Sequence, residues 1–262
     1  MITVSDILKT VETLAPVYMK EDWDRVGLNC GHLDHPVTKV LVALDPFAAA
    51  IAEAKEMGAE VLVTHHPLMW DTGFINDSTD QGRRMLDLME SGIAHINAHT
   101  NLDCAPGGVN DELAARLKLR EVQIIHPAGT DEQGRPYGLL RQGTTDIHDL
   151  EAFLGLVKQE LNCPGLRYVS GGKPVCRVAV GGGACGSELY EAAAAGCDTF
   201  VTSDIKYNQF WDAQALGLNL IDAGHFYTEN PVCRVLAETI QTAFPELIVK
   251  ISRNHEDCMK FF

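Results

Sequence analysis

The sequence predicts an α/β (α+β) fold built from two similar domains that arose by internal duplication. Residues 39–64 and 177–202 align without a gap, and both read as an apolar strand, an alanine-rich helix, a glycine and a second apolar strand. Further along, residues 92–98 and 217–223 are each an apolar strand introduced by glycine. Strands that alternate with helices in this way are typical of parallel sheets covered by helices.

We expect the first domain to span residues 1–122. Apolar residues at helical spacing predict its helices, and continuous apolar runs predict its buried strands. Residues 21–28 read as a polar, glycine-containing loop. In chain order the expected elements are a helix at 5–15, a strand at 37–44, a helix at 47–57, a strand at 60–64, a helix at 81–91, a strand at 93–98 and a helix that Asn110 caps.

We expect the second domain to span residues 123–262. The pattern changes at about residue 120 to short strand-like pieces separated by turns, with one helix at 149–161. The second copy of the repeat then begins at residue 177. The C-terminal segment is a candidate to pack on the first domain.

Composition excludes several classes of partner. The 262 residues are 46% hydrophobic, enough for a sizeable core, and carry a net charge of −15. Without clustered Lys and Arg, binding to nucleic acid or to an anionic membrane is not expected. The first residues do not read as a signal peptide, so we expect a cytoplasmic protein. The eight cysteines contain no Cys-x-x-Cys pair, and most of them are expected to be reduced core residues.

Metal-binding residue types follow the predicted strands of the first domain. The strand at 60–64 runs directly into His65 and His66, and Pro67 ends it because proline cannot continue a central strand. The strand at 93–98 is followed by His99 and, four residues later, by Asp103. Because parallel strands end at the same edge of a sheet, these side chains are expected to lie close together.

The second domain repeats part of this pattern. The strand at 217–223 is followed by His225 and Glu229, which share the His-x-x-x-carboxylate spacing of the first domain. This spacing brings both side chains to one side of a helical turn. The position equivalent to the two adjacent histidines holds Ser203 and Asp204, so the scaffold is predicted to be symmetric and the ligands asymmetric.

Imidazole and carboxylate groups are donors that zinc, iron, manganese, cobalt and nickel share. Five of them are too many for one catalytic zinc but suit two ions. We expect the adjacent histidines to serve different ions, Glu229 to bridge them, and the site to lie at the interface of the two domains. The proposed ligands are His65, His66, Asp103, His225 and Glu229.

Other interpretations of these residues stay open. Asp103 could instead cap the turn at 106–108, and Glu229 could instead favour the start of the next helix. His99 could be a ligand, a proton carrier or a partner that orients Asp103, and we favour the last. The glycines at 181–183 could cradle a phosphate, but a tight turn near the site is the better interpretation because the P-loop lysine is missing.

Five segments together resemble the Nif-three-like dinuclear-metal-centre family, whose members are named as GTP cyclohydrolase type 2 homologues. The resemblance covers essentially the whole chain in order. Ser203 stands where the family often has glycine, and Asn208 lies where a histidine is often found. The segments are residues 21–28 (EDWDRVGL), 64–68 (THHPL), 99–103 (HTNLD), 203–207 (SDIKY) and 222–229 (DAGHFYTE).

The resemblance implies two α/β domains, a two-metal site at their interface and a ring-shaped homohexamer whose sites face an internal cavity. It places the metal ligands on the same five residues, with Lys206 and Tyr207 near them. It implies two divalent ions per subunit, zinc, iron or manganese, and a small-molecule substrate, with a nucleotide as one candidate.

The implied function is a metal-dependent hydrolase similar to GTP cyclohydrolase type 2, acting through a metal-bound hydroxide, with His99 and Lys206 as further candidate site residues. The alternative is a metal-handling, chaperone-like protein without turnover. A third interpretation is a scaffold protein in which the metals are structural.

Overall fold

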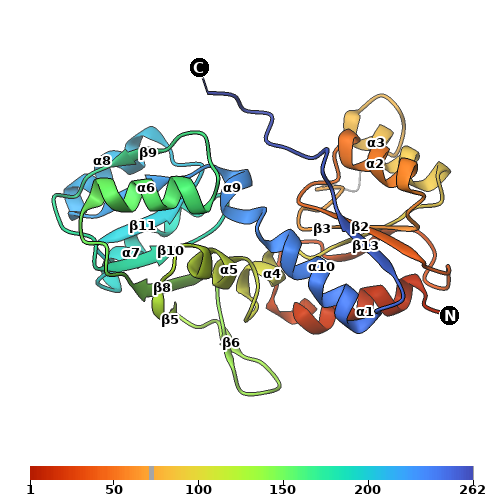
Figure 1. Cartoon of the computed structure of the whole chain (residues 1–262), viewed down its shortest axis with the longest axis horizontal. Helices are drawn as coiled ribbons and strands as arrows, with labels where there is room; N and C mark the ends of the chain where they lie inside the picture. Colours follow the sequence, from red (N-terminus) through yellow and green to blue (C-terminus); the bar gives the residue numbers. More distant parts are fainter. Residues whose placement is uncertain (71–73, 262) are drawn as a thin grey trace. The chain divides into compact units, whose positions relative to one another are not determined.

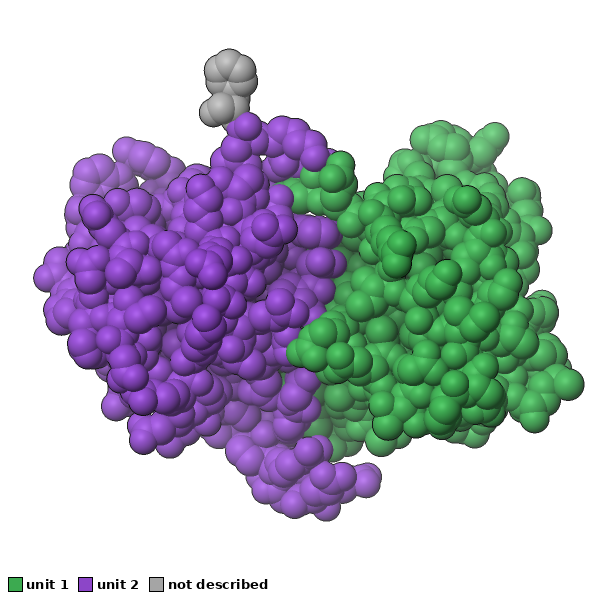
Figure 2. Space-filling model, viewed as in Figure 1, with its two compact units in different colours: residues 1–105, 232–257 green, residues 106–231, 258–262 purple. Residues whose placement is uncertain are grey.

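The computed structural model describes residues 1–70 and 74–261. The chain forms two compact units, shown in different colours in Figure 2. Unit 1 contains residues 1–105 and 232–257, and unit 2 contains residues 106–231 and 258–262. In the described part of the chain, no helix has both the length and the apolar character that crossing a membrane requires.

Unit 1 is built on a five-stranded sheet with the order β1-β4-β3-β2-β13. The strands β2, β3, β4 and β13 run parallel, and β1 pairs antiparallel with β4 at one edge. Their bounds are β1 (Gly27–Cys30), β2 (Lys39–Ala43), β3 (Val61–Thr64), β4 (Ala94–Asn97) and β13 (Ile248–Ile251).

Helices cover both faces of this sheet (Figure 1). The helices α2 (Ala48–Met57) and α3 (Asp80–Glu90) pack on one face, where Leu41 and Leu62 point into a shared core. The helices α1 (Val4–Leu14) and α10 (Val232–Ala243) pack together on the other face. Since successive strand residues alternate between faces, a strand covered on both sides must be apolar throughout, which explains the continuous runs in β2 and β3.

Unit 2 is built on a six-stranded sheet with the order β5-β8-β10-β11-β12-β9. The central strands β10, β11 and β12 run parallel, while β5, β8 and β9 pair antiparallel with their neighbours. Their bounds are β5 (Arg120–Ile125), β8 (Leu140–Thr144), β9 (Arg167–Val169), β10 (Arg177–Val180), β11 (Thr199–Thr202) and β12 (Asn219–Asp222), and β6 (Gly129–Thr130) and β7 (Pro136–Tyr137) form a separate hairpin.

Two cores flank the sheet of unit 2. One contains residues of α5 (Val109–Arg116) and α6 (Leu150–Glu160), and the other contains residues of α7 (Leu189–Ala194) and α8 (Tyr207–Leu216). Phe153 lies in the first core and Phe200 in the second, both fully buried. The α/β class expected from the sequence is therefore confirmed.

The division of the chain differs from the boundary expected at residue 122. Unit 2 begins after Ala105, because α5 packs on β8 and β5 pairs with the same strand. The chain returns to unit 1 at Val232, where α10 packs on α1 and β13 extends the sheet beside β2. The segment expected to be a loop at 21–28 ends in β1, whose first residue is Gly27.

A buried hydrogen-bond chain supports the end of β3. The hydroxyl of Thr64 donates to the carbonyl oxygen of His66 at 2.6 Å, and it therefore accepts the Nε2–H of His95 at 2.7 Å. His95 lies on the neighbouring strand β4 and is fully buried. Burial, with a further contribution from the charge of Arg84, lowers the pKa of His95 to about 3.

Acid is expected to destabilise the protein through His95. The unfolded chain binds a proton on this ring near pH 6.5, whereas the folded protein does so only near pH 3. The free energy of unfolding should therefore decrease as the pH falls from 6.5 toward 3, by at most ~1.4 kcal/mol per pH unit from this group. Urea unfolding across this range measures the slope.

His95→Gln is the matched variant, because its amide keeps a donor for Thr64 but does not titrate. Its pH dependence should be shallower than that of the wild type just below pH 6.5. Identical slopes for the two proteins in that range would show that the His95 prediction is wrong.

Candidate metal centre

His65 lies at the carboxyl end of β3 with its side chain completely buried. Its Nδ1 is 2.9 Å from the carbonyl oxygen of Ala98. A carbonyl oxygen only accepts hydrogen bonds, so Nδ1 carries the proton and Nε2 is left with its lone pair. That Nε2 lies 3.5 Å from Oδ1 of Asp103. The two predicted ligands are thus brought together within unit 1.

His66 is oriented by a carboxylate. Its Nδ1 lies 2.6 Å from Oδ1 of Asp45, the second residue after β2, and the other oxygen of Asp45 lies 2.7 Å from Nε2 of His255. Burial alone would raise the pKa of Asp45, but the hydrogen bonds from His255 and His66 outweigh it and hold this pKa well below its usual range. Asp45 is therefore ionised and accepts the Nδ1–H of His66.

His99 also has an aspartate, Asp24, beside its ring. Its Nδ1 lies 3.0 Å from Oδ1 of Asp24, whose other oxygen accepts the backbone N–H of Thr100. Burial acts to raise the pKa of Asp24, but these hydrogen bonds overcome it and lower the pKa far below the usual value. The sequence favoured a role for His99 in orienting Asp103, and that role stays a prediction. The His99 ring lies beside those of His65 and His66.

The three imidazoles of unit 1 form a compact cluster. One ligand atom from each lies within 4.8 Å of the others. The indole rings of Trp23 and Trp70 lie near His99, with ring centroids 6.0 Å and 5.2 Å away. A cluster of imidazoles beside aromatic rings is a suitable binding site for a transition-metal ion.

In unit 2, His225 and Glu229 lie on the short helix α9 (His225–Glu229). His225 Nε2 is 3.0 Å from Oε2 of Glu229, and His225 Nδ1 is 2.7 Å from Oδ2 of Asp204, which follows β11. Burial acts to lower the pKa of His225, but the hydrogen bonds to both carboxylates prevail and raise it to about 11. The expected pairing of His225 with Glu229 across one helical turn is present.

The glycine loop after β10 packs against this pair. The backbone N–H of Gly181 donates to Val201, that of Gly182 to the side chain of Asn110, and that of Gly183 to the hydroxyl of Thr228. These amides are used by the fold, which favours the tight-turn interpretation over a phosphate cradle. Gly183 has φ +65°, and a Cβ there would lie 1.9 Å from Oε1 of Glu229.

The histidines of both units share one feature, which is an acceptor on Nδ1. The acceptor is a carbonyl for His65 and an aspartate for the other three, so each ring offers Nε2 as its ligand atom. Lys206 is exposed at the start of α8, and its role stays a prediction.

Sequence reasoning missed most of the groups that orient the imidazoles. Asp24 and Asp204 lie inside two of the segments that carry the family resemblance, and Asp45 follows a strand that ends beside β3. An acidic residue at a strand end was thus an available signal. His255 carried none, because it reaches Asp45 from a distant part of the chain.

Comparisons of the sequence with a family model and with known proteins point to the same family. Residues 2–257 match the model of the Duf34/NIF3 (NGG1p interacting factor 3) family. A Clostridium perfringens protein named GTP cyclohydrolase 1 type 2 homolog is 34% identical over 240 residues, covering 91% of both chains. A Streptomyces coelicolor protein of the same name is 35% identical over 237 residues, covering 88% of this chain and 83% of that one.

The fold is also similar to solved structures. A Bacillus cereus protein related to NIF3 superposes with a TM-score of 0.93 at 24% identity, covering 100% of this chain and 99% of that one. A Staphylococcus aureus hypothetical protein gives 0.88 at 28% identity, covering 99% of both.

Asp45→Asn is expected to weaken metal binding. The amide keeps the size of the carboxylate but loses its charge, so the Nδ1–H bond that orients His66 is weakened. We expect the affinity for Zn²⁺ to fall roughly 10- to 100-fold, as for other outer partners of metal-binding histidines. Competition with a chromophoric chelator measures it. Asp34→Asn, at an exposed position, is the control. Equal affinities for the two variants would argue against this role of Asp45.

Gly183→Ala is expected to displace the carboxylate of Glu229, because the added Cβ and Oε1 cannot both keep their places. The affinity for Zn²⁺ should fall at least roughly tenfold. Gly134→Ala is the matched control, since Gly134 also has a positive φ of 77° but a Cβ there meets nothing within 4 Å. It should show the backbone strain, about 1 kcal/mol, without the loss of metal. A loss shared by both variants would attribute the effect to strain.

Proposed function

Because the chain belongs to the Duf34/NIF3 family, we propose that it is a dinuclear metal-dependent hydrolase. Family membership confirms the resemblance seen in the five sequence segments. The name of its relatives, GTP cyclohydrolase 1 type 2 homolog, suggests which substrates to test first. A small molecule with a hydrolysable ring or ester bond is the proposed substrate class, and nucleotides are its first candidates.

The observation that carries the proposal is the orientation of the histidines. Four buried or half-buried imidazoles have an oxygen acceptor beside Nδ1, so Nε2 is the nitrogen that an ion would take, in His225 by displacing a proton shared with Glu229. Free surface histidines have no such constraint. Nitrogen donors of this kind, combined with carboxylates, suit zinc, iron and manganese, so the residues present fit the ions expected from the sequence.

We propose that the two units contribute to one centre that binds two ions. His65, His66 and Asp103 would be the ligands from unit 1, and His225 and Glu229 those from unit 2, with Glu229 bridging the ions. His99 is a further nitrogen donor, since its ring belongs to the cluster of unit 1. When bound, such ions lower the pKa of a coordinated water and polarise the substrate.

The residues of the chain orient the imidazoles and hold a proton on His225. Asp24, Asp45 and Asp204 hold three imidazoles in fixed directions, which limits the reorganisation needed when a ligand binds. Without metal, His225 is protonated between Asp204 and Glu229, so an ion that takes its Nε2 must displace that proton. The indoles of Trp23 and Trp70 provide an apolar wall beside His99.

The alternative is a metal-handling protein without turnover. The observation that favours it is that His65, His66 and His99 belong to one unit and cluster without help from the other. Three imidazoles can hold a single ion that is then passed on. The proposed homohexamer and cytoplasmic location are compatible with both functions and do not separate them.

Turnover by the metal-reconstituted protein tests the proposal. We expect about two transition-metal ions per chain after purification without chelator. The wild type should hydrolyse at least one member of a panel of GTP, cyclic amides and phosphoesters. Glu229→Gln keeps the shape of the side chain but removes the charge that would bridge the ions, so the rate should fall roughly 100-fold or more.

Glu90→Gln, an exposed glutamate of α3, is the control and should keep full activity. His65→Ala/His66→Ala should lose most of the metal, whereas His32→Ala/His35→Ala, at two exposed histidines, should retain it. Tight, exchangeable metal with no turnover on the whole panel would favour the carrier. Less than one ion per chain in the wild type would contradict both functions.

A further inference from the structure

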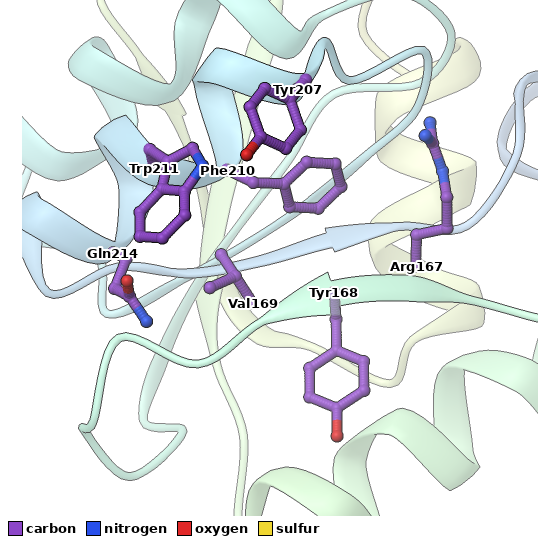
Figure 3. Close-up of a pocket in the computed structure, with 7 residues that line it drawn as sticks. All are labelled: Arg167, Tyr168, Val169, Tyr207, Phe210, Trp211 and Gln214. Atoms are coloured by element: carbon purple, nitrogen blue, oxygen red, sulfur yellow. The ribbon is translucent and has the colours of Figure 1, made fainter.

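Unit 2 has a pocket between α8 and the edge strand β9 (Figure 3). The cavity measures about 360 Å³. Tyr207, Phe210, Trp211 and Gln214 line it from the helix, and Arg167, Tyr168 and Val169 line it from the strand. The side chain of Tyr168 extends from β9 in the direction opposite to that of Val169 (Figure 3), as the alternation of side chains along a strand requires. The pocket is therefore mainly aromatic.

The aromatic rings of the pocket differ in exposure, with Phe210 forming its floor and Tyr207 and Trp211 forming its rim. Phe210 is half-buried and packs on the core beneath α8. Tyr207 and Trp211 are 79% and 59% exposed, and their ring centroids lie 6.5 Å apart at an interplanar angle of 76°. Large aromatic rings exposed beside a cavity indicate a binding surface rather than a part of the core.

The polar groups of the pocket limit the kind of ligand. The guanidinium of Arg167 pairs with Asp222 and lies over the Phe210 ring, 5.6 Å from its centroid. Its charge is thus already compensated, which disfavours a polyanion. The amide of Gln214 offers both a donor and an acceptor, which matches the edge of a nitrogen heterocycle.

The pairing of β9 with β12 shows which end of the pocket lies toward His225. Arg167 pairs with Asp222, the last residue of β12, and Val169 pairs with Leu220 farther back. Arg167 therefore lies beside the carboxyl end of β12. The last residue of that strand, Asp222, is three residues before His225 in the sequence. Tyr207 opens α8 shortly after Asp204, the hydrogen-bond partner of His225. One end of the pocket thus lies toward the strand ends that carry the metal-binding pair of unit 2.

We propose that this pocket binds the planar heteroaromatic ring of a small-molecule ligand, with the rest of that ligand directed toward His225. As a substrate subsite it rests on the proposed function. The ring stacks on Trp211 and Tyr207, and its edge meets Gln214. The cavity volume suits a bicyclic ring such as a purine.

Two other occupants fit the observations less well. A peptide added to the edge of the sheet would gain few main-chain hydrogen bonds, because β9 has only three residues. A second copy of the chain would need a much larger surface than this concave site, since stable interfaces bury about 800 Å² on each partner.

Calorimetric titration of the full-length protein in the presence of chelator tests ring binding without the metal centre. Guanosine and adenosine should bind saturably, whereas ribose 5-phosphate, which lacks the ring, should not bind. Trp211→Ala removes the stacking surface at an exposed position and should lower the affinity at least tenfold. Because the titration needs no metal, failure of the metal centre would leave this result unchanged.

Phe74→Ala serves as the control, because it removes an exposed ring in unit 1. It should bind guanosine like the wild type, with circular dichroism confirming that both variants fold. The proposal is overturned if neither nucleoside binds, if Phe74→Ala loses as much affinity as Trp211→Ala, or if Trp211→Ala changes the oligomeric state and leaves binding intact.

Discussion

The candidate centre depends on hydrogen bonds that fix one nitrogen of each imidazole. A histidine ring is a good metal ligand only in the tautomer whose free nitrogen points at the ion, and an isolated ring exchanges its tautomers and rotates. Here a carbonyl oxygen fixes His65, aspartates fix His66 and His225, and Asp24 lies 3.0 Å from Nδ1 of His99. The aspartates do this while ionised, because the hydrogen bonds they accept outweigh the cost of burying them.

The fold places these acceptors by a simple rule of parallel sheets. In unit 1, β2, β3 and β4 are neighbours, and the residues just beyond their carboxyl ends include Asp45, His65 with His66, and Ala98. In unit 2, β11 and β12 are neighbours and end just before Asp204 and His225. His65, His66 and His225 therefore take their acceptors from an adjacent strand end, and a register shift of one residue would turn those acceptors away.

This rule explains what the sequence predicts well and what it does not. His65, His66 and Asp103 could be selected as candidates because donor residues at the ends of apolar runs are visible in a one-dimensional pattern. The same pattern cannot show that residues 232–257 return to unit 1, since the return depends on the pairing of β13 with β2. The contact of His255 with Asp45 follows from that return, so no local signal could have predicted it.

The two units differ in the charge that surrounds their histidines. His65 in unit 1 has a neutral carbonyl on Nδ1, and burial keeps its surroundings poor in water. His225 in unit 2 lies between two carboxylates, which raise its pKa to about 11 and leave that segment with a net negative charge even when the ring is protonated. A divalent ion that replaces the proton restores the balance of charge there. The donors of unit 1 thus favour a ligand of defined geometry, and those of unit 2 favour a divalent cation.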